Sequence, residues 1–164
     1  MQNSGSAGPT RNYKILNPEI IRSKFLMNQE HDYVNYFYEK FEGRVAIGVG
    51  YDQDLSEIYP FVFEDADGKS IGVVALGVHT YENITYAHIY HIGSFKTQRG
   101  NGSKILQELC FQADKYQVIL SLSPVFIPNG KTDPMSDEQL MSWYGRFGFR
   151  GSSPFRREPL LKSL

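Results

Sequence analysis

The chain has 164 residues, 41% of them apolar, a formal net charge of −1 and one cysteine, Cys110. The near-neutral charge offers no basic surface for nucleic acid, and a single cysteine excludes an internal disulfide framework, which is typical of a reducing compartment. Because no apolar run approaches the roughly 18 residues of a membrane span, we expect a cytoplasmic protein without a membrane partner.

The N-terminal third of the chain predicts a tail and two short helices. Residues 1–12 are rich in Gly, Ser and Asn and predict a disordered tail ahead of one domain over residues 13–164. Asn17-Pro18 predicts a helix start. Residues 30–32 predict a break, and residues 33–41 predict a second helix with an aromatic face that packs into the core.

Strand patterns follow, and they predict residues 45–49, 59–64, 71–78 and 86–92 as strands. Asp67-Gly68 is a strong hairpin signal between two of them. Sequential strands with short connections predict an antiparallel meander. The fold class is therefore α/β (α+β), with a mixed, mainly antiparallel sheet.

The C-terminal half predicts two helices and two further strands. Residues 102–114 have an apolar face at helical spacing, and Cys110 on that face is a small buried hydrophobe rather than a nucleophile. A right-handed crossover makes a strand at 118–123 parallel to its predecessor. Ser136 to Gln139 form a capping box that starts a helix ending near Gly148, and residues 153–156 predict an edge strand.

The stretch from Ile92 to Leu106 predicts a site for a phosphate group. It passes from a strand end through a glycine loop into a helix, where unpaired N–H groups and the helix dipole attract anions. Gly100 and Gly102 allow a ligand to approach the backbone. The spacing does not match the P-loop pattern G-x-x-x-x-G-K-[ST] or the third glycine of a dinucleotide fingerprint.

Residues 97–102, Thr-Gln-Arg-Gly-Asn-Gly, resemble the pyrophosphate loop Q/R-x-x-G-x-G/A of the GNAT acyl-CoA N-acyltransferases, although Thr97 departs from that pattern. Residues 143–149 resemble the Y-x-x-x-G-F ending of the last helix of the same family. The resemblance covers about residues 44–157. It implies a GNAT fold, in which helices flank a twisted sheet and a central parallel pair, here 86–92 and 118–123, splays apart to admit acyl-CoA.

The resemblance also implies roles for individual residues. The backbone around Ile92 would bind the pantetheine arm, and the amides of the loop would bind the pyrophosphate, with charge added by Arg99 and Lys104. Tyr144 would lie near the thioester sulfur and protonate the leaving thiolate, which suits a phenol that stays protonated at neutral pH. The implied cofactor-binding residues are Ile92, Gly93, Ser94, Thr97, Gln98, Arg99, Gly100, Asn101, Gly102, Ser103 and Lys104.

The amine nucleophile must lose a proton, and the strand before the loop carries the candidate bases for it. Strand alternation predicts Tyr86, His88 and Tyr90 on one face and His91 on the other. His88 matches the position of a strand histidine in serotonin N-acetyltransferase-like members, so it is the candidate base. His79, His91, Glu82 and ordered water are alternatives. Because the alternation separates His88 from His91, no metal site is predicted.

The expected activity is transfer of an acetyl group from acetyl-CoA to a primary amine by direct attack in a ternary complex. Ser121, Ser123 and Cys110 have no adjacent base in the sequence, so no acyl-enzyme is expected. The acceptor would enter between the N-terminal helices and residues 124–135. The first 57 residues contain acidic side chains that would either attract a cationic amine or simply be solvated. They are Glu30, Asp32, Asp52, Asp54 and Glu57.

Two other interpretations stay open. The first is a non-catalytic CoA-binding regulatory or interaction module on the same fold, and the second is a nucleotide-binding domain unrelated to the GNAT family. The partners expected for the enzyme are acetyl-CoA and an amine-bearing small molecule or protein, and the chain is expected to be a monomer or a homodimer.

Overall fold

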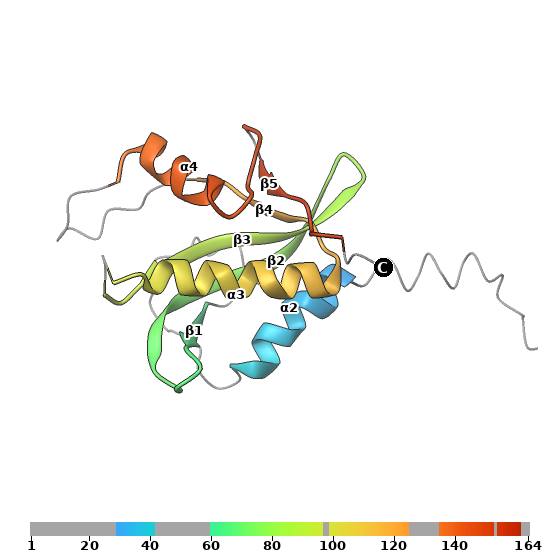
Figure 1. The fold of residues 1–164 in the computed structure, drawn as a ribbon. Helices are drawn as coiled ribbons and strands as arrows, with labels where there is room; N and C mark the ends of the chain where they lie inside the picture. Colours follow the sequence, from blue (N-terminus) through green and yellow to red (C-terminus); the bar gives the residue numbers. More distant parts are fainter. Residues whose placement is uncertain (1–28, 42–59, 97–98, 125–134, 153, 162–164) are drawn as a thin grey trace, which may run out of the picture.

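The computed structural model describes residues 29–41, 60–96, 99–124, 135–152 and 154–161. The predicted tail, the helix after Asn17-Pro18 and the strand at 45–49 lie outside these residues. The helices and strands in chain order are α2 (Gln29–Lys40), β1 (Phe61–Glu64), β2 (Ser70–Tyr81), β3 (Ile84–Ser94), α3 (Asn101–Tyr116), β4 (Leu120–Leu122), α4 (Asp137–Gly145) and β5 (Phe155–Arg157) (Figure 1).

The strands form one sheet in the order β1-β2-β3-β4-β5. The β1–β2, β2–β3 and β4–β5 pairs are antiparallel, and β3 and β4 are parallel. This arrangement confirms the predicted meander, the parallel strand after α3 and the mixed, mainly antiparallel fold class. Among the described residues, no helix is long and apolar enough to cross a membrane.

Two hairpins join the first three strands. In the first, Asp65 Oδ1 accepts from the amides of Asp67 (3.1 Å) and Lys69 (3.0 Å), and Gly68 has a φ of 73°. In the second, Glu82 (φ 48°) and Asn83 (φ 65°) form a tight left-handed turn. The second turn extends both strands beyond their predicted ends, because glutamate is not a turn residue that sequence patterns indicate.

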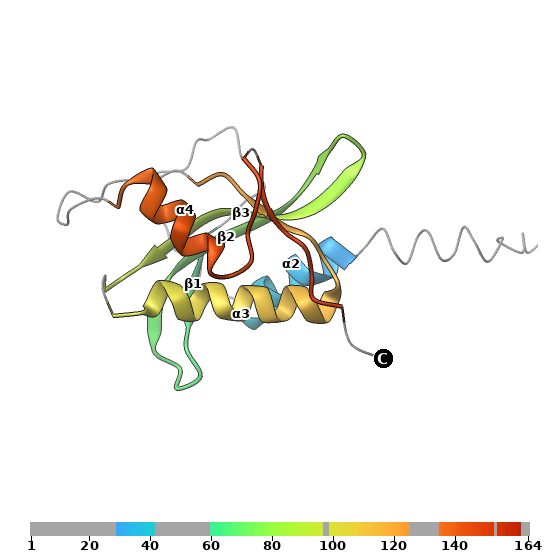
Figure 2. The ribbon, with the colours of Figure 1, turned by 45° about the horizontal axis from the view of Figure 1, so that its top comes forward.

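Helix α2 begins at Gln29, so the predicted break at residues 30–32 is wrong. Glu30 and Asp32 instead lie in its first turn, where acidic side chains complement the helix dipole. The aromatic face is buried, as predicted, and Tyr33 donates a hydrogen bond to the carbonyl of Leu109 in α3 (3.1 Å). Helices α2 and α3 therefore pack together on one face of the sheet (Figure 2).

The sheet has two chemically different faces. Leu120 and Leu122 of β4 belong to the same hydrophobic core as Leu109 of α3. Ser121 between them is also buried but lies outside that core, because alternate residues of a strand point to opposite faces. The face that carries α3 is called the helix face below, and the face of Ser121 is called the polar face.

A close approach of β2 to β3 makes Gly72 the most constrained glycine described. A Cβ there would lie 2.2 Å from the Gly93 carbonyl oxygen and 2.7 Å from Ile105 Cδ1. We expect Gly72→Ala to lower the free energy of unfolding by about 1–3 kcal/mol, the usual cost of overpacking, in denaturant titrations. Gly68→Ala meets no atom within 4 Å, so it should cost only the strain of its φ of +73°; equal losses for both variants would contradict the close approach.

Candidate active site

The N-terminus of α3 has no internal partner for its first amides. Its N-cap is Gly100, with a φ of 74° and no side chain to accept a hydrogen bond, and its first turn contains no acidic residue. The first backbone bond runs from the Lys104 amide to the Gly100 carbonyl (3.0 Å), so the amides before Lys104 stay free for another acceptor. This helix end therefore suits an external anion.

Helix α4 shows the contrast within the same chain. Ser136 Oγ accepts from the Gln139 amide (3.2 Å), and Gln139 Oε1 accepts from the Ser136 amide (2.9 Å), which confirms the predicted capping box. Asp137 and Glu138 add negative charge to its first turn. Helix α4 is thus satisfied by its own side chains, whereas α3 is not.

Two cations lie beside the open end of α3. Arg99 and Lys104 are both exposed. The ion pairs within the described residues are Lys40–Glu108 and Arg157–Asp114, so neither cation is engaged there. Thr97 and Gln98, the other predicted loop residues, lie outside the described residues.

Trp143 connects α4 to this end of α3. Its indole N–H donates to Ser103 Oγ (3.0 Å), and its ring lies 3.5 Å from the position of a Cβ on Gly102. The sequence motif contained Trp143 but did not indicate this contact. That distance is ordinary van der Waals contact, so the indole packs against Gly102 without requiring a glycine there.

Strand β3 continues beyond its pairing with β4. Strand β4 pairs with β3 only at Ala87, His88 and Ile89, whereas β2 continues to pair with β3 as far as Ser94. Along residues 92–94, no described strand pairs with the edge that faces away from β2. An extended ligand can add to such an edge as an extra strand, and this edge leads directly toward the open end of α3.

A β-bulge changes the faces on which the β3 side chains lie. Ile89 is opposite Leu76 and His91 is opposite Ala75, so Tyr90 is the extra residue. Because Leu76 and Ala75 are consecutive, they point to opposite faces, and so do their partners Ile89 and His91. The predicted separation of His88 from His91 is therefore wrong: both lie on the polar face.

His88 lies in the polar surroundings of this face. Its Nδ1 is 2.8 Å from Ser121 Oγ, and its ring is 4.5 Å from that of Tyr90 and 5.8 Å from that of His79. Burial and, to a lesser extent, the charge of His79 lower the pKa of His88 to about 4, so the ring is neutral at physiological pH. The expectation that Ser121 has no adjacent base is also wrong, although the hydroxyl is buried.

Tyr144 lies on the helix face. Its ring contacts Trp143 (4.6 Å) and Phe149 (5.7 Å), and Phe149 stacks on Phe155 of β5. Burial raises the pKa of Tyr144 to about 12, so the phenol stays protonated throughout the physiological range. No described residue makes a hydrogen bond with its hydroxyl.

The candidate acid and the candidate base thus lie on opposite faces of the sheet, on either side of the place where β3 and β4 part.

The other candidate side chains that the structure describes do not lie where β3 and β4 part. Cys110 is buried, as predicted, and burial raises its pKa to about 12. Glu30 and Asp32 belong to α2 on the helix face, so they do not surround His88. Within the described ranges, no group of three His, Cys, Asp or Glu side chains is placed to hold a metal ion.

The chain resembles a number of solved structures, two of which follow. One is described as a GCN5-related glucosamine N-acetyltransferase region of a fungal multi-domain GH3 beta-N-acetylglucosaminidase; it is 16% identical, with a TM-score of 0.42, over 77% of this chain and 16% of that chain. The other is described as histone acetyltransferase HPA2 and related acetyltransferase from Corynebacterium glutamicum ATCC 13032; it is 13% identical, with a TM-score of 0.41, over 92% of this chain and 87% of that one. No protein-family model and no curated protein matches the chain.

Proposed function

We propose that this protein is an acyl-CoA-dependent N-acyltransferase of the GNAT type, which transfers an acetyl group from acetyl-CoA to a primary amine. The observation that carries the proposal is the open N-terminus of α3, without a side-chain cap or an acid in its first turn. It follows a strand whose residues 92–94 pair with no described strand on the side away from β2. CoA carries a diphosphate, which suits the open helix end, and an extended amide-bearing arm, which suits the strand edge.

In this proposal, the amides of Asn101, Gly102 and Ser103 bind the diphosphate of CoA, with Arg99 and Lys104 beside it. The pantetheine arm follows the β3 edge from Ser94 toward the bulge at Tyr90. A backbone N–H of residues 92–94 polarises the thioester carbonyl, and one such donor is typically worth about 100-fold in rate.

The chemical step is direct attack of the amine nitrogen on the thioester carbon. A C–N bond forms, the C–S bond breaks, and the leaving sulfur takes the proton of the Tyr144 hydroxyl, which regains a proton from water before the next turnover. The nitrogen loses a proton to His88, which accepts it at Nε2 when Nδ1–H donates to Ser121 Oγ. Because the pKa of His88 is about 4, the ring holds the proton only briefly and passes it to water.

The experiment that tests this function combines acetyl-CoA binding by calorimetry with thiol release in the presence of a panel of primary amines. We expect saturable binding and amine-dependent release of CoA. Binding without turnover on any amine would favour the non-catalytic CoA-binding module. Stabilisation by ATP but not by acetyl-CoA would favour a nucleotide-binding domain.

A variant at the start of α3 tests whether this helix end binds a ligand or is an ordinary helix N-terminus. Asn101→Asp adds a carboxylate to the first turn, which should stabilise the helix by about 0.5 kcal/mol through its dipole but repel the diphosphate. We expect the Kd of acetyl-CoA to rise about tenfold or more while the thermal midpoint stays the same or rises. Gln107→Glu, an exposed change of equal charge farther along α3, is the control, and an equal loss of affinity there would contradict the site.

A further inference from the structure

A row of polar side chains crosses the polar face of the sheet. His88 is paired with Ser121, Ser121 with Arg156, and Arg156 with Arg150 through an isolated bridge. Directly paired residues of neighbouring strands point to the same face. The candidate base therefore shares a face with Arg156, which the sequence did not indicate because it does not show strand pairing.

The Arg156 side chain extends back toward β3. Its guanidinium carbon lies 5.2 Å from the centre of the Tyr86 ring, and Tyr86 is buried two residues before His88. Residues two apart on a strand are separated by about 7 Å. A small molecule can therefore span the distance between the Arg156 guanidinium and His88.

The Arg156 guanidinium has no acceptor among the described residues. The ion pairs there involve Lys40 and Arg157, and the side-chain hydrogen bonds of the described residues include none from Arg156. A half-buried guanidinium presents planar N–H donors that match a carboxylate or a phosphate.

Arg150 pairs with Arg156 through the backbone, whose groups bond reciprocally at 2.7 and 2.8 Å. Its side chain is engaged elsewhere, because Arg150 Nη1 donates to the carbonyls of Gly145 (2.7 Å) and Phe149 (2.6 Å). Of these two arginines, Arg156 is therefore the one whose guanidinium has no acceptor among the described residues.

We propose that the acceptor is a small amine that also carries a carboxylate or phosphate group, and that Arg156 binds this anionic group while the amine lies beside His88. This inference rests on the proposed function. It differs from the other possibility raised by the sequence, that acidic residues attract a cationic amine. Of those residues, Glu30 and Asp32 belong to α2 on the helix face, and Asp52, Asp54 and Glu57 lie outside the described residues.

The test compares matched amines that differ by one anionic group, with acetyl-CoA as donor. The pairs are glycine and glycinamide, 4-aminobutyrate and butylamine, and O-phosphoethanolamine and ethanolamine. We expect kcat/KM to be about 10- to 100-fold higher for the anionic member of at least one pair, as for a charge-assisted bidentate contact. The carboxylate and phosphate pairs show which oxyanion is preferred.

Variants assign this preference to Arg156. Arg156→Gln should remove it by lowering kcat/KM for the anionic member alone, and Arg156→Lys should retain part of it. Lys115→Gln removes the same charge from an exposed site at the end of α3 and should leave the preference unchanged. Thermal midpoints confirm that each variant is folded.

The outcomes separate this inference from the proposed function. Equal use of both members of every pair, equal losses for both members in Arg156→Gln, or acetyl-CoA binding with no anionic amine used would overturn the inference. If acetyl-CoA does not bind at all, the proposed function fails. Calorimetry with O-phosphoethanolamine and 4-aminobutyrate, in wild type and Arg156→Gln, then decides the anion site by itself: Arg156-dependent binding supports it and no binding overturns it.

Discussion

Replacing Tyr144 with Phe is expected to lower kcat for acetyl transfer by about 100-fold, the usual contribution of a general acid, with little change in acetyl-CoA affinity or stability. Burial raises the pKa of this phenol to about 12, so the hydroxyl carries its proton when the thiolate leaves. Because no described residue bonds to the hydroxyl, its removal leaves no described group unpaired. Steady-state kinetics, calorimetry and thermal unfolding measure the three quantities.

Tyr33→Phe is the matched control. It removes the same atom from another buried tyrosine, whose hydroxyl donates to the Leu109 carbonyl (3.1 Å). This change should cost about 1 kcal/mol of stability and leave kcat intact. Full activity in Tyr144→Phe would rule out the phenol as the acid, and a parallel loss of activity in both variants would indicate a general effect on the fold.

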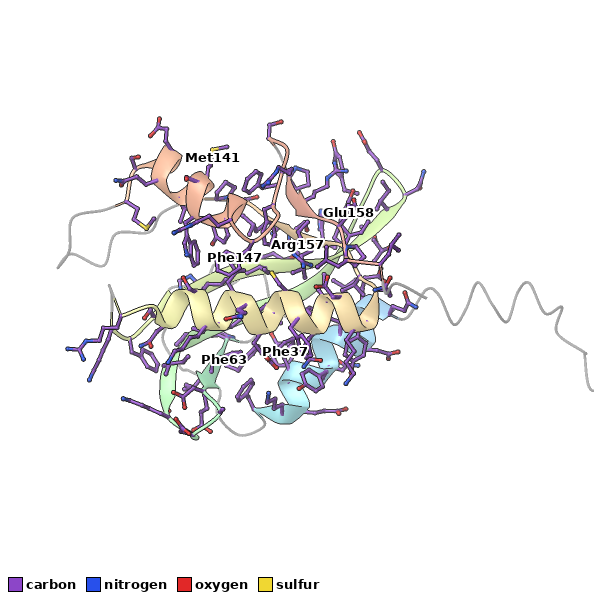
Figure 3. All side chains as sticks on the ribbon, in the orientation of Figure 1. Phe37, Phe63, Met141, Phe147, Arg157 and Glu158 are labelled. Carbon is purple, nitrogen blue, oxygen red and sulfur yellow. The ribbon has the colours of Figure 1, made fainter. Side chains whose placement is uncertain are left out.

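Replacing Arg157 with Met is expected to lower the free energy of unfolding by about 3 kcal/mol, because it leaves a partly buried carboxylate without its main partner. Arg157 binds both oxygens of Asp114 in α3, at 2.7 and 2.8 Å, and its Nε donates to the Phe147 carbonyl (2.8 Å). The Arg157 side chain is only 7% exposed. Figure 3 shows Arg157 between β5 and α3, where it joins the C-terminal strand to the helix.

Denaturant titration measures this loss. The exposed pair Lys40–Glu108, at 3.5 Å, is the comparison, and Lys40→Met should cost no more than about 0.5 kcal/mol. A loss for Arg157→Met as small as that for Lys40→Met would show that the buried pair does not join β5 to α3.

The same pair predicts a pH dependence of stability. Burial raises the pKa of Asp114, but the hydrogen bonds from Arg157 and the Leu160 amide and the charge of Arg157 outweigh it, so the pKa is lowered from 3.8. The stability contributed by this carboxylate is therefore present above pH 3.8 and is lost as the pH falls through its folded pKa. His88 also lowers the stability as the pH falls, because burial lowers its pKa from 6.5 to about 4. That loss of stability occurs between pH 6.5 and about 4, above the pH range in which Asp114 is protonated, so the two effects are separate.

Much of the fold was predictable because its signals are local. The Asp65–Gly68 turn, Gly100 before α3 and the Ser136–Gln139 capping box each depend on hydrogen bonds or φ angles within a few residues. Apolar periodicity placed the helices and strands, although the break predicted at residues 30–32 was wrong. The order of the elements then left few ways to pair the strands.

The elements, their order and the open start of α3 could be predicted because each is encoded in neighbouring residues. Which side chains share a face could be seen only once the strands were paired. The bulge at Tyr90 moves His91 to the side of His88, and strand pairing brings Ser121 and Arg156 into the same row. Such contacts join residues from separate strands, and the register that aligns them is set by packing of the whole sheet rather than by any local pattern.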